Sequence, residues 1–146
     1  MTSLSESQNR RSTMIKTILV DDDFLVLQAL ETILSVQDHI EVVGTGSDGH
    51  DAVELYITHQ PDLVLMDIRM EPTTGIEAAE TILKDFPDAK ILFLTTFQDD
   101  EYITKALSLG CRGYLLKQHI KGILPAIDAV MNGQIVYDST IEMPVK

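Results

Sequence analysis

The sequence lacks the features that cross-link a chain or anchor it in a membrane. It contains one cysteine, Cys111, which excludes an intramolecular disulfide and any zinc site built from several thiolates. No apolar run approaches the roughly 18–20 residues that a membrane-spanning helix requires. Residues 1–13 also lack the apolar segment of a secretory signal. We therefore expect a cytoplasmic protein that does not insert into a membrane.

Basic residues are scarce as well. The chain has 11 Lys and Arg against 23 Asp and Glu, which gives a formal net charge of −12. This balance argues against direct binding of nucleic acid or of an anionic membrane. A length of 146 residues corresponds to one domain with its own core. We expect a flexible tail at residues 1–13, a folded domain at 14–133 and the start of a linker at 134–146.

The expected domain alternates between short apolar runs and segments with helical spacing. The apolar runs predict strands at Ile15–Val20, Ile40–Gly44, Asp62–Met66, Lys90–Leu94 and Gly113–Leu116. The helical spacing predicts helices at Phe24–Val36, Asp51–His59, Ile76–Lys84, Asp99–Leu109 and Ile120–Met131. Asp23 and Asp48 are candidate N-caps. Pro125 weakens the last helix or delays its start, and a short extended piece is expected at Gln134–Tyr137.

Continuous apolar strands are typical of a parallel sheet that helices cover on both faces. Right-handed crossovers leave few topologies for a chain of alternating strands and helices. The sequence therefore predicts an α/β fold with a doubly wound five-stranded parallel sheet in the order 2-1-3-4-5, as a three-layer sandwich.

The chemistry of such a sheet is expected at the carboxyl ends of its strands. The polar residues that follow the strands are Asp21, Asp22 and Asp23, then Asp67, then Thr95 and Thr96, and finally Lys117. Strands one and three would be neighbours, so Asp67 would lie beside Asp21 and Asp22. Clustered carboxylates repel each other unless a cation neutralises them or one is protonated. Oxygen ligands favour Mg²⁺, while a lysine and a hydroxyl opposite them favour an anion such as a phosphoryl group.

Two other kinds of protein share parts of this pattern. Gly44, Gly46 and Gly49 match the spacing of a dinucleotide-binding loop, but the chain is short for that fold and the acids and lysine would have no purpose. Asp21 and Asp23 match the acids of an aspartate-based phosphatase loop. That family expects Thr or Val where this chain has Leu25, and its cap insertions are absent.

Four motifs in order carry a more specific resemblance. They are Ile18-Leu19-Val20-Asp21-Asp22, then Asp62 to Met70 with Gly75, then Leu94-Thr95-Thr96, and finally Gly113-Tyr114-Leu115-Leu116-Lys117. From about Ile15 to Gly133 the chain resembles the receiver domain of two-component response regulators, which has a flavodoxin- or CheY-like fold. Thr95-Thr96-Phe97 and the absence of proline after Lys117 resemble the LuxR/NarL-type subfamily.

The resemblance implies a role for each matching residue. Asp67 would accept a phosphoryl group from a phosphohistidine on a sensor histidine kinase. Asp21 and Asp22 would help to hold Mg²⁺, with Asp67 and the backbone carbonyl of Arg69 as direct ligands. The resemblance implies that Lys117 would pair with the phosphoryl oxygens and that the Thr95 hydroxyl would move toward them. Tyr114 would then shift inward.

The same resemblance implies partners and an output. Phosphorylation would promote homodimerisation, and DNA would be bound only through a helix-turn-helix domain that does not lie within these 146 residues. An excised receiver is favoured over a stand-alone one.

Two positions depart from the family pattern. Glu71 and Gln118 stand where proline is usual, and Pro72 comes one place late. A cis bond before Gln118 would cost about 3–4 kcal/mol, so we expect it to be trans. Glu71 adds a carboxylate near the phosphorylation loop, where it would either weaken phosphoryl binding or strengthen metal binding.

We predict a slowly hydrolysed phosphoryl group. By resemblance, Arg69 and Phe97 flank the approach of the hydrolytic water; Phe97 cannot orient a water, and Arg69 could shield the phosphoryl oxygens unless Glu71 holds it away. Excluding one water costs about 1–3 kcal/mol in the barrier, or roughly 10–100-fold in rate. Phe97→Glu should therefore lose its phosphoryl group faster than the parent in a time course of intact mass. Equal rates would remove Phe97 as the gate.

Overall fold

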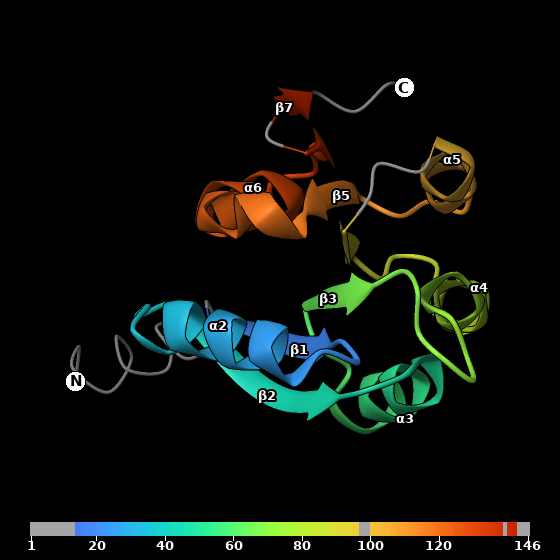
Figure 1. Cartoon of the computed structure of the whole chain (residues 1–146), viewed down its shortest axis with the longest axis horizontal. Helices are drawn as coiled ribbons and strands as arrows, with labels where there is room; N and C mark the ends of the chain where they lie inside the picture. The colour runs from blue at the N-terminus through green and yellow to red at the C-terminus, as the bar shows by residue number, and fades with distance from the viewer. Residues whose placement is uncertain (1–13, 97–99, 139, 143–146) are drawn as a thin grey trace, which may run out of the picture.

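The computed structural model describes residues 14–96, 100–138 and 140–142 as one sheet flanked by helices (Figure 1). The strands are β1 (Ile15–Val20), β2 (Ile40–Gly46), β3 (Leu63–Asp67), β4 (Ile91–Thr95), β5 (Gly113–Leu116), β6 (Ile135–Tyr137) and β7 (Thr140–Glu142). The helices are α2 (Phe24–Ser35), α3 (Gly49–His59), α4 (Gly75–Asp85), α5 (Asp100–Ser108) and α6 (Ile123–Met131), with a 3-10 segment, η1 (Lys117–Gly122), before α6.

The first five strands confirm the predicted topology. They lie in the order β2-β1-β3-β4-β5, and every neighbouring pair among them is parallel. Parallel strands joined by helices bring all their carboxyl ends to one edge of the sheet. The loops that carry the predicted site therefore meet there.

The predicted number of strands was wrong, because two more strands extend the sheet. Residues Ile135–Tyr137 pair with β5 as the parallel strand β6, and Thr140–Glu142 return antiparallel to it as β7. The pairing depends on Gly113, whose φ of +121° and close approach to the Val136 backbone leave no room for a Cβ atom. The short extended piece expected at Gln134–Tyr137 is thus confirmed as β6. Its pairing with β5 and the strand β7 were not predicted, because three-residue strands carry too little periodicity.

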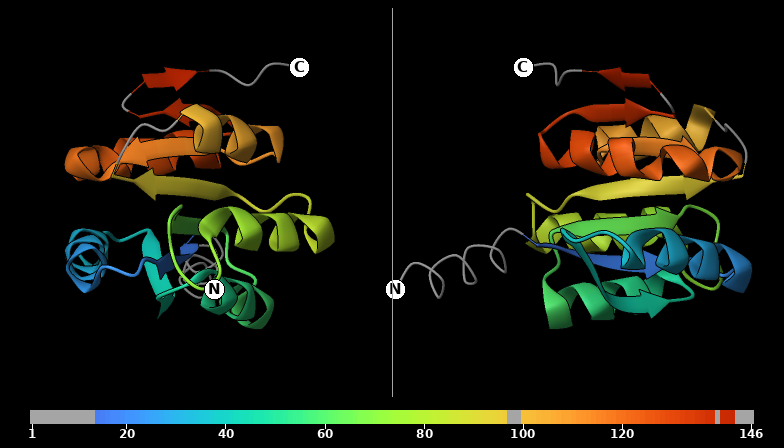
Figure 2. Two further views of the ribbon diagram at one scale, coloured as in Figure 1. Left: turned by 45° about the vertical axis from the view of Figure 1, so that its right-hand side comes forward. Right: turned by 90° about the vertical axis from the view of Figure 1, so that its left-hand side faces the viewer.

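Helices cover both faces of the sheet. Helices α2 and α6 lie on one side, and α3, α4 and α5 lie on the other (Figures 1 and 2). Alternate residues of each strand point to opposite faces, so Val64 and Met66 join the core under α3–α5 while Leu63 and Leu65 join the core under α2 and α6. All four are fully buried, which stabilises the fold by about 1.5–3 kcal/mol for each large apolar side chain.

Polar side chains define where several helices begin. Asp23 accepts a hydrogen bond from the Leu25 amide (2.9 Å), and Asp48 accepts one from the Asp51 amide (2.8 Å), which confirms both predicted N-caps. Thr74 forms a reciprocal capping box with Glu77 at the start of α4.

The segment after β5 confirms the delayed start of the last helix. Helix α6 begins at Ile123, two residues before Pro125, after the 3-10 segment. Within the described residues the one cis peptide bond joins Glu71 to Pro72, so the bond before Gln118 is trans as expected. In the part of the chain that the structure describes, no helix is long and apolar enough to cross a bilayer.

Gly113 provides a test of the β5–β6 pairing. Gly113→Ala should lower the free energy of unfolding by about 3 kcal/mol or more, because a Cβ atom meets both a positive φ and the Val136 carbonyl. Gly110→Ala is the control, since Gly110 also has a positive φ (+97°) but nothing within 4 Å. That variant should lose only about 1–2 kcal/mol. Equal losses in urea denaturation would contradict the packing argument.

Candidate functional site

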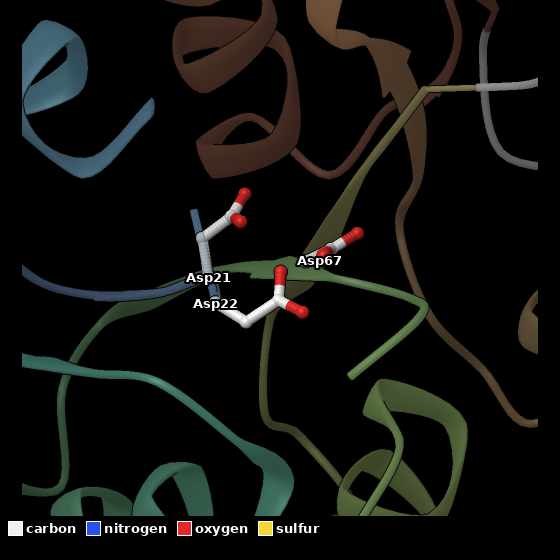
Figure 3. Close-up of side chains that lie close together, drawn as sticks. All are labelled: Asp21, Asp22 and Asp67. Carbon is white, nitrogen blue, oxygen red and sulfur yellow. The ribbon is translucent and has the colours of Figure 1, made fainter. Parts of the chain in front are cut away.

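Three carboxylates converge at the ends of two adjacent strands (Figure 3). Asp21 and Asp22 follow β1 directly, and Asp67 is the last residue of β3. Strands β1 and β3 pair up to Val20 and Met66, so the register places the acids side by side. One carboxylate oxygen from each residue lies within 4.8 Å of the others. The predicted proximity of these acids is therefore confirmed.

Lys117 reaches the same point from the end of β5. Its Nζ atom lies 2.8 Å from Asp21 Oδ2 and 3.3 Å from Asp67 Oδ2. The lysine side chain is 15% exposed, so these ion pairs are largely shielded from solvent. Thr95, the last residue of β4, is also buried at this edge of the sheet. The structure thus brings together five residues of the predicted site, Asp21, Asp22, Asp67, Thr95 and Lys117.

Burial changes the protonation behaviour of the acids. Asp67 is 5% exposed, and burial, together with the nearby charge of Asp21, raises its pKa to about 6, against the opposing effect of Lys117. Burial also raises the pKa of Asp21, although Lys117 opposes that change. For Lys117, burial alone would lower the pKa, but the two carboxylates outweigh it and the net pKa is raised. At neutral pH most of the Asp67 population is therefore ionised, beside the Lys117 ammonium group.

The donors suit a hard divalent cation. One oxygen of Asp21, Oδ1, accepts a hydrogen bond from the Asp23 amide (2.8 Å), while the buried Oδ2 pairs with the Lys117 ammonium. One lysine leaves the three carboxylates incompletely neutralised. An all-oxygen donor set with excess negative charge is what Mg²⁺ binds in proteins.

A cavity of about 210 Å³ opens in front of these groups. Its lining residues are Asp22, Asp23, Asp67, Arg69, Thr95, Thr96 and Lys117. Since a water molecule occupies about 30 Å³ of the liquid, the cavity can hold several waters or a small tetrahedral anion. Acidic residues line one part of it, and a lysine with two hydroxyls lines another. This arrangement suits an anion that is held together with a cation.

The roles predicted for Arg69, Tyr114 and Phe97 are not tested by this structure. Arg69 is exposed and lines the cavity, but no geometry identifies its carbonyl as a metal ligand, so that role stays a prediction. Tyr114 on β5 is 7% exposed and packs in the core under α3–α5. Its predicted movement is not tested by one structure. Phe97 lies outside the described residues.

One supporting residue was missed by the sequence analysis. Asp138 Oδ1 accepts a hydrogen bond from the Leu116 amide (3.0 Å), and Asp138 Oδ2 lies 2.9 Å from His119 Nδ1. Asp138 thereby holds the chain on both sides of Lys117. It lies 22 residues from Leu116 and is placed by the pairing of β6 with β5, so no local pattern could have indicated it.

The glycine motif has a structural explanation. Cβ atoms at Gly44 and Gly46 would press on side chains of α3, and one at Gly49 would collide with the backbone of Thr73 and Thr74. These glycines allow α3 to pack closely against β2 and the loop before α4. Gly44 and Gly46 lie within the edge strand β2, and Gly49 begins α3. Strand β1 separates β2 from β3, which ends at Asp67.

Comparisons with known proteins agree with the geometry. Residues 17–128 match the family described as response regulator receiver domain. The chain is 43% identical over 125 residues to the transcriptional regulatory protein DesR of Bacillus subtilis (strain 168), which covers 85% of this chain and 62% of DesR. The chain spans about half to three-fifths of the length of the curated relatives that it matches.

Solved structures show the same fold. A two-component response regulator of the LuxR family from Aurantimonas sp. SI85-9A1 superposes with a TM-score of 0.78 at 30% identity, covering 82% of this chain and 86% of that one. A DNA-binding response regulator of the LuxR family from Staphylococcus aureus has a TM-score of 0.76 at 28% identity, covering 82% of this chain and 100% of that one.

The raised pKa of Asp67 makes stability depend on pH. Because the folded pKa, about 6, exceeds the usual 3.8, the charged form destabilises the metal-free fold above pH 6, and this cost disappears as the pH falls toward 4. Asp67→Asn should therefore raise the free energy of unfolding by about 2–3 kcal/mol at pH 7.5 in EDTA, and by much less at pH 4.5.

The measurement is urea denaturation of the parent and the variant at both pH values. Asp62→Asn is a control with the same change of charge, because Asp62 lies outside the cluster and its side chain bonds the Lys16 amide. A pH-independent effect of Asp67→Asn would contradict the assigned burial cost.

Proposed function

Because the chain belongs to the response regulator receiver domain family of two-component systems, we propose that Asp67 accepts a phosphoryl group from a phosphohistidine on a sensor histidine kinase. The observation that carries the proposal is the position of the Lys117 ammonium, which lies between Asp21 and Asp67 at the wall of a cavity large enough for the phosphoryl group. The geometry supports this function better than dinucleotide binding or phosphoester hydrolysis.

The proposed transfer uses Asp67 as the nucleophile. A carboxylate oxygen of Asp67 attacks phosphorus, and the bond from phosphorus to the imidazole nitrogen breaks, with its electron pair remaining on the nitrogen. A pKa of about 6 leaves most of the Asp67 population ionised at neutral pH, as a nucleophile requires. Lys117 then shifts from partial pairing with Asp67 toward the phosphoryl oxygens that now carry the negative charge.

The acidic residues support a cofactor in this proposal. Asp21 and Asp22 would hold Mg²⁺ together with Asp67 and the backbone carbonyl of Arg69. Bound Mg²⁺ would supply charge neutralisation for the transferring group. Within the site, Asp21 has a further task, because its Oδ1 bond to the Asp23 amide and its Oδ2 pair with Lys117 keep the lysine directed at Asp67.

The conformational output would begin at Thr95 and Tyr114. The Thr95 hydroxyl lines the cavity at the end of β4, and β4 pairs directly with the strand that contains Tyr114. Movement of the hydroxyl toward the phosphoryl oxygens would change the space available to the Tyr114 ring. Tyr114 is already buried against the α5 side of the sheet, so a small displacement there would alter the surface of α5.

The relatives also support a proposal for the role of this domain in a longer protein. The curated relatives are named transcriptional regulators, and the chain spans only part of their length. We propose that this domain controls transcription in the bacterial cytoplasm through a helix-turn-helix output domain and that phosphorylation promotes a homodimer. The chain is a receiver rather than a conventional enzyme. Its proposed chemistry is limited to self-phosphorylation, including from small phosphodonors, and slow self-dephosphorylation.

Incubation with acetyl phosphate and Mg²⁺ should add one phosphoryl mass to the parent chain. Asp67→Asn should gain none, because the nucleophile is lost. Asp22→Ala should gain phosphoryl slowly and bind Mg²⁺ about tenfold more weakly or worse, since losing the exposed Asp22 carboxylate removes a ligand and negative charge. Asp48→Ala is the control for a lost acid, as Asp48 caps α3 away from the cavity. Labelling of Asp67→Asn at the parent level would overturn the assignment.

A further inference from the structure

Arg69 forms the wall between two cavities. It lines the cavity that contains Asp67, and it also lines a neighbouring cavity of about 430 Å³ that Glu71 and Tyr102 help to form. Arg69 follows Asp67 by two residues and lines the cavity that contains Asp67, here called the acceptor cavity. Since it also lines the neighbouring cavity, a movement of its side chain changes the shape of both.

The guanidinium group lies over an aromatic ring. Arg69 Cζ is 5.1 Å from the ring centroid of Tyr102, within the range of a cation–π contact. Tyr102 belongs to the first turn of α5 and remains 40% exposed. The contact joins the loop after β3 to α5, the helix that follows β4. It thus links a residue that lines the acceptor cavity to α5.

The site offers Arg69 a second partner once it is phosphorylated. The acceptor cavity already has more carboxylates than basic groups, and a phosphoryl group on Asp67 adds oxygens that match the planar donors of a guanidinium. For exposed side chains, an arginine–anion pair and a cation–π contact are of comparable strength. Neither position of Arg69 then dominates, and the Tyr102 ring sets the ratio between them.

We propose that Tyr102 is a positioning residue that draws Arg69 away from the phosphoryl group and thereby sets the lifetime of the phosphorylated state. This inference rests on the proposed function of Asp67. In the loss reaction, a water oxygen attacks phosphorus and the bond from phosphorus to the Asp67 oxygen breaks, which yields the Asp67 carboxylate and inorganic phosphate. When the Arg69 guanidinium pairs with the phosphoryl oxygens, it blocks the approach of that water. When it lies over the Tyr102 ring, the approach stays open.

Tyr102→Leu should lengthen the half-life of the phosphoryl group about two- to fivefold, the change expected when one exposed cation–π contact is removed. Tyr102→Phe keeps the ring and should retain the parent half-life. In an Arg69→Ala background, Tyr102→Leu should have no effect. The 146-residue chain is phosphorylated with acetyl phosphate and Mg²⁺, the donor is removed by desalting, and intact mass is followed with time.

A role in packing alone would give a different result. Equal half-lives of Tyr102→Leu and the parent, equal behaviour of the Leu and Phe variants, or an unchanged effect in the Arg69→Ala background would each overturn the proposal. If the parent gains no phosphoryl mass, the proposed function fails and the lifetime role fails with it.

A second measurement tests the contact without phosphorylation. In the metal-free chain, ring-current shielding should move the Arg69 side-chain proton resonances upfield in the parent and in Tyr102→Phe, and this shift should disappear in Tyr102→Leu. Unshielded Arg69 protons in the parent would overturn the proposal even if phosphorylation proceeds. Shielded protons in a chain that gains no phosphoryl mass would confine the failure to the proposed function.

Discussion

Two buried carboxylates share one ammonium group, and this imbalance shapes the rest of the site. Asp21 and Asp67 are at most 5% exposed, and Lys117 lies within 3.3 Å of both. Removing a carboxylate from water costs several kcal/mol, and one partner cannot fully compensate two. The fold tolerates the cost because apolar strands below the site hold the acids in place. The charge that remains unbalanced is what makes this edge of the sheet ready for a cation and a transferable anion.

The position of Lys117 depends on residues distant in sequence. The strand that directly precedes it, β5, is bounded by β4 on one side and β6 on the other. Asp138, just after β6, accepts a hydrogen bond from the Leu116 amide and lies close to His119. These contacts fix the turn that contains Lys117. The β6 strand therefore does more than extend the sheet. It makes the direction of the ammonium group depend on the packing of the C-terminal segment against Gly113.

The first five strands and the acids at their ends could be predicted from local sequence patterns. The pairing that extends the sheet to β6 and β7 could not. Continuous apolar runs such as Leu63–Met66 show burial on both faces, and strand order then places Asp67 beside Asp21 by topology alone. The pairing of β6 with β5, the bond from Asp138 to Leu116 and the contact between Arg69 and Tyr102 all join segments far apart in the chain. Such contacts depend on the folded geometry, and no spacing in the sequence records them.

The buried thiol of Cys111 gives the chain a practical property. The side chain is 2% exposed, and burial raises its pKa to about 12, so almost no reactive thiolate is present at neutral pH. The sequence also has no tryptophan. The folded chain should therefore react little with maleimides, and it gives no indole fluorescence. A single spin label, dye or tryptophan placed on a surface helix would report on that position alone.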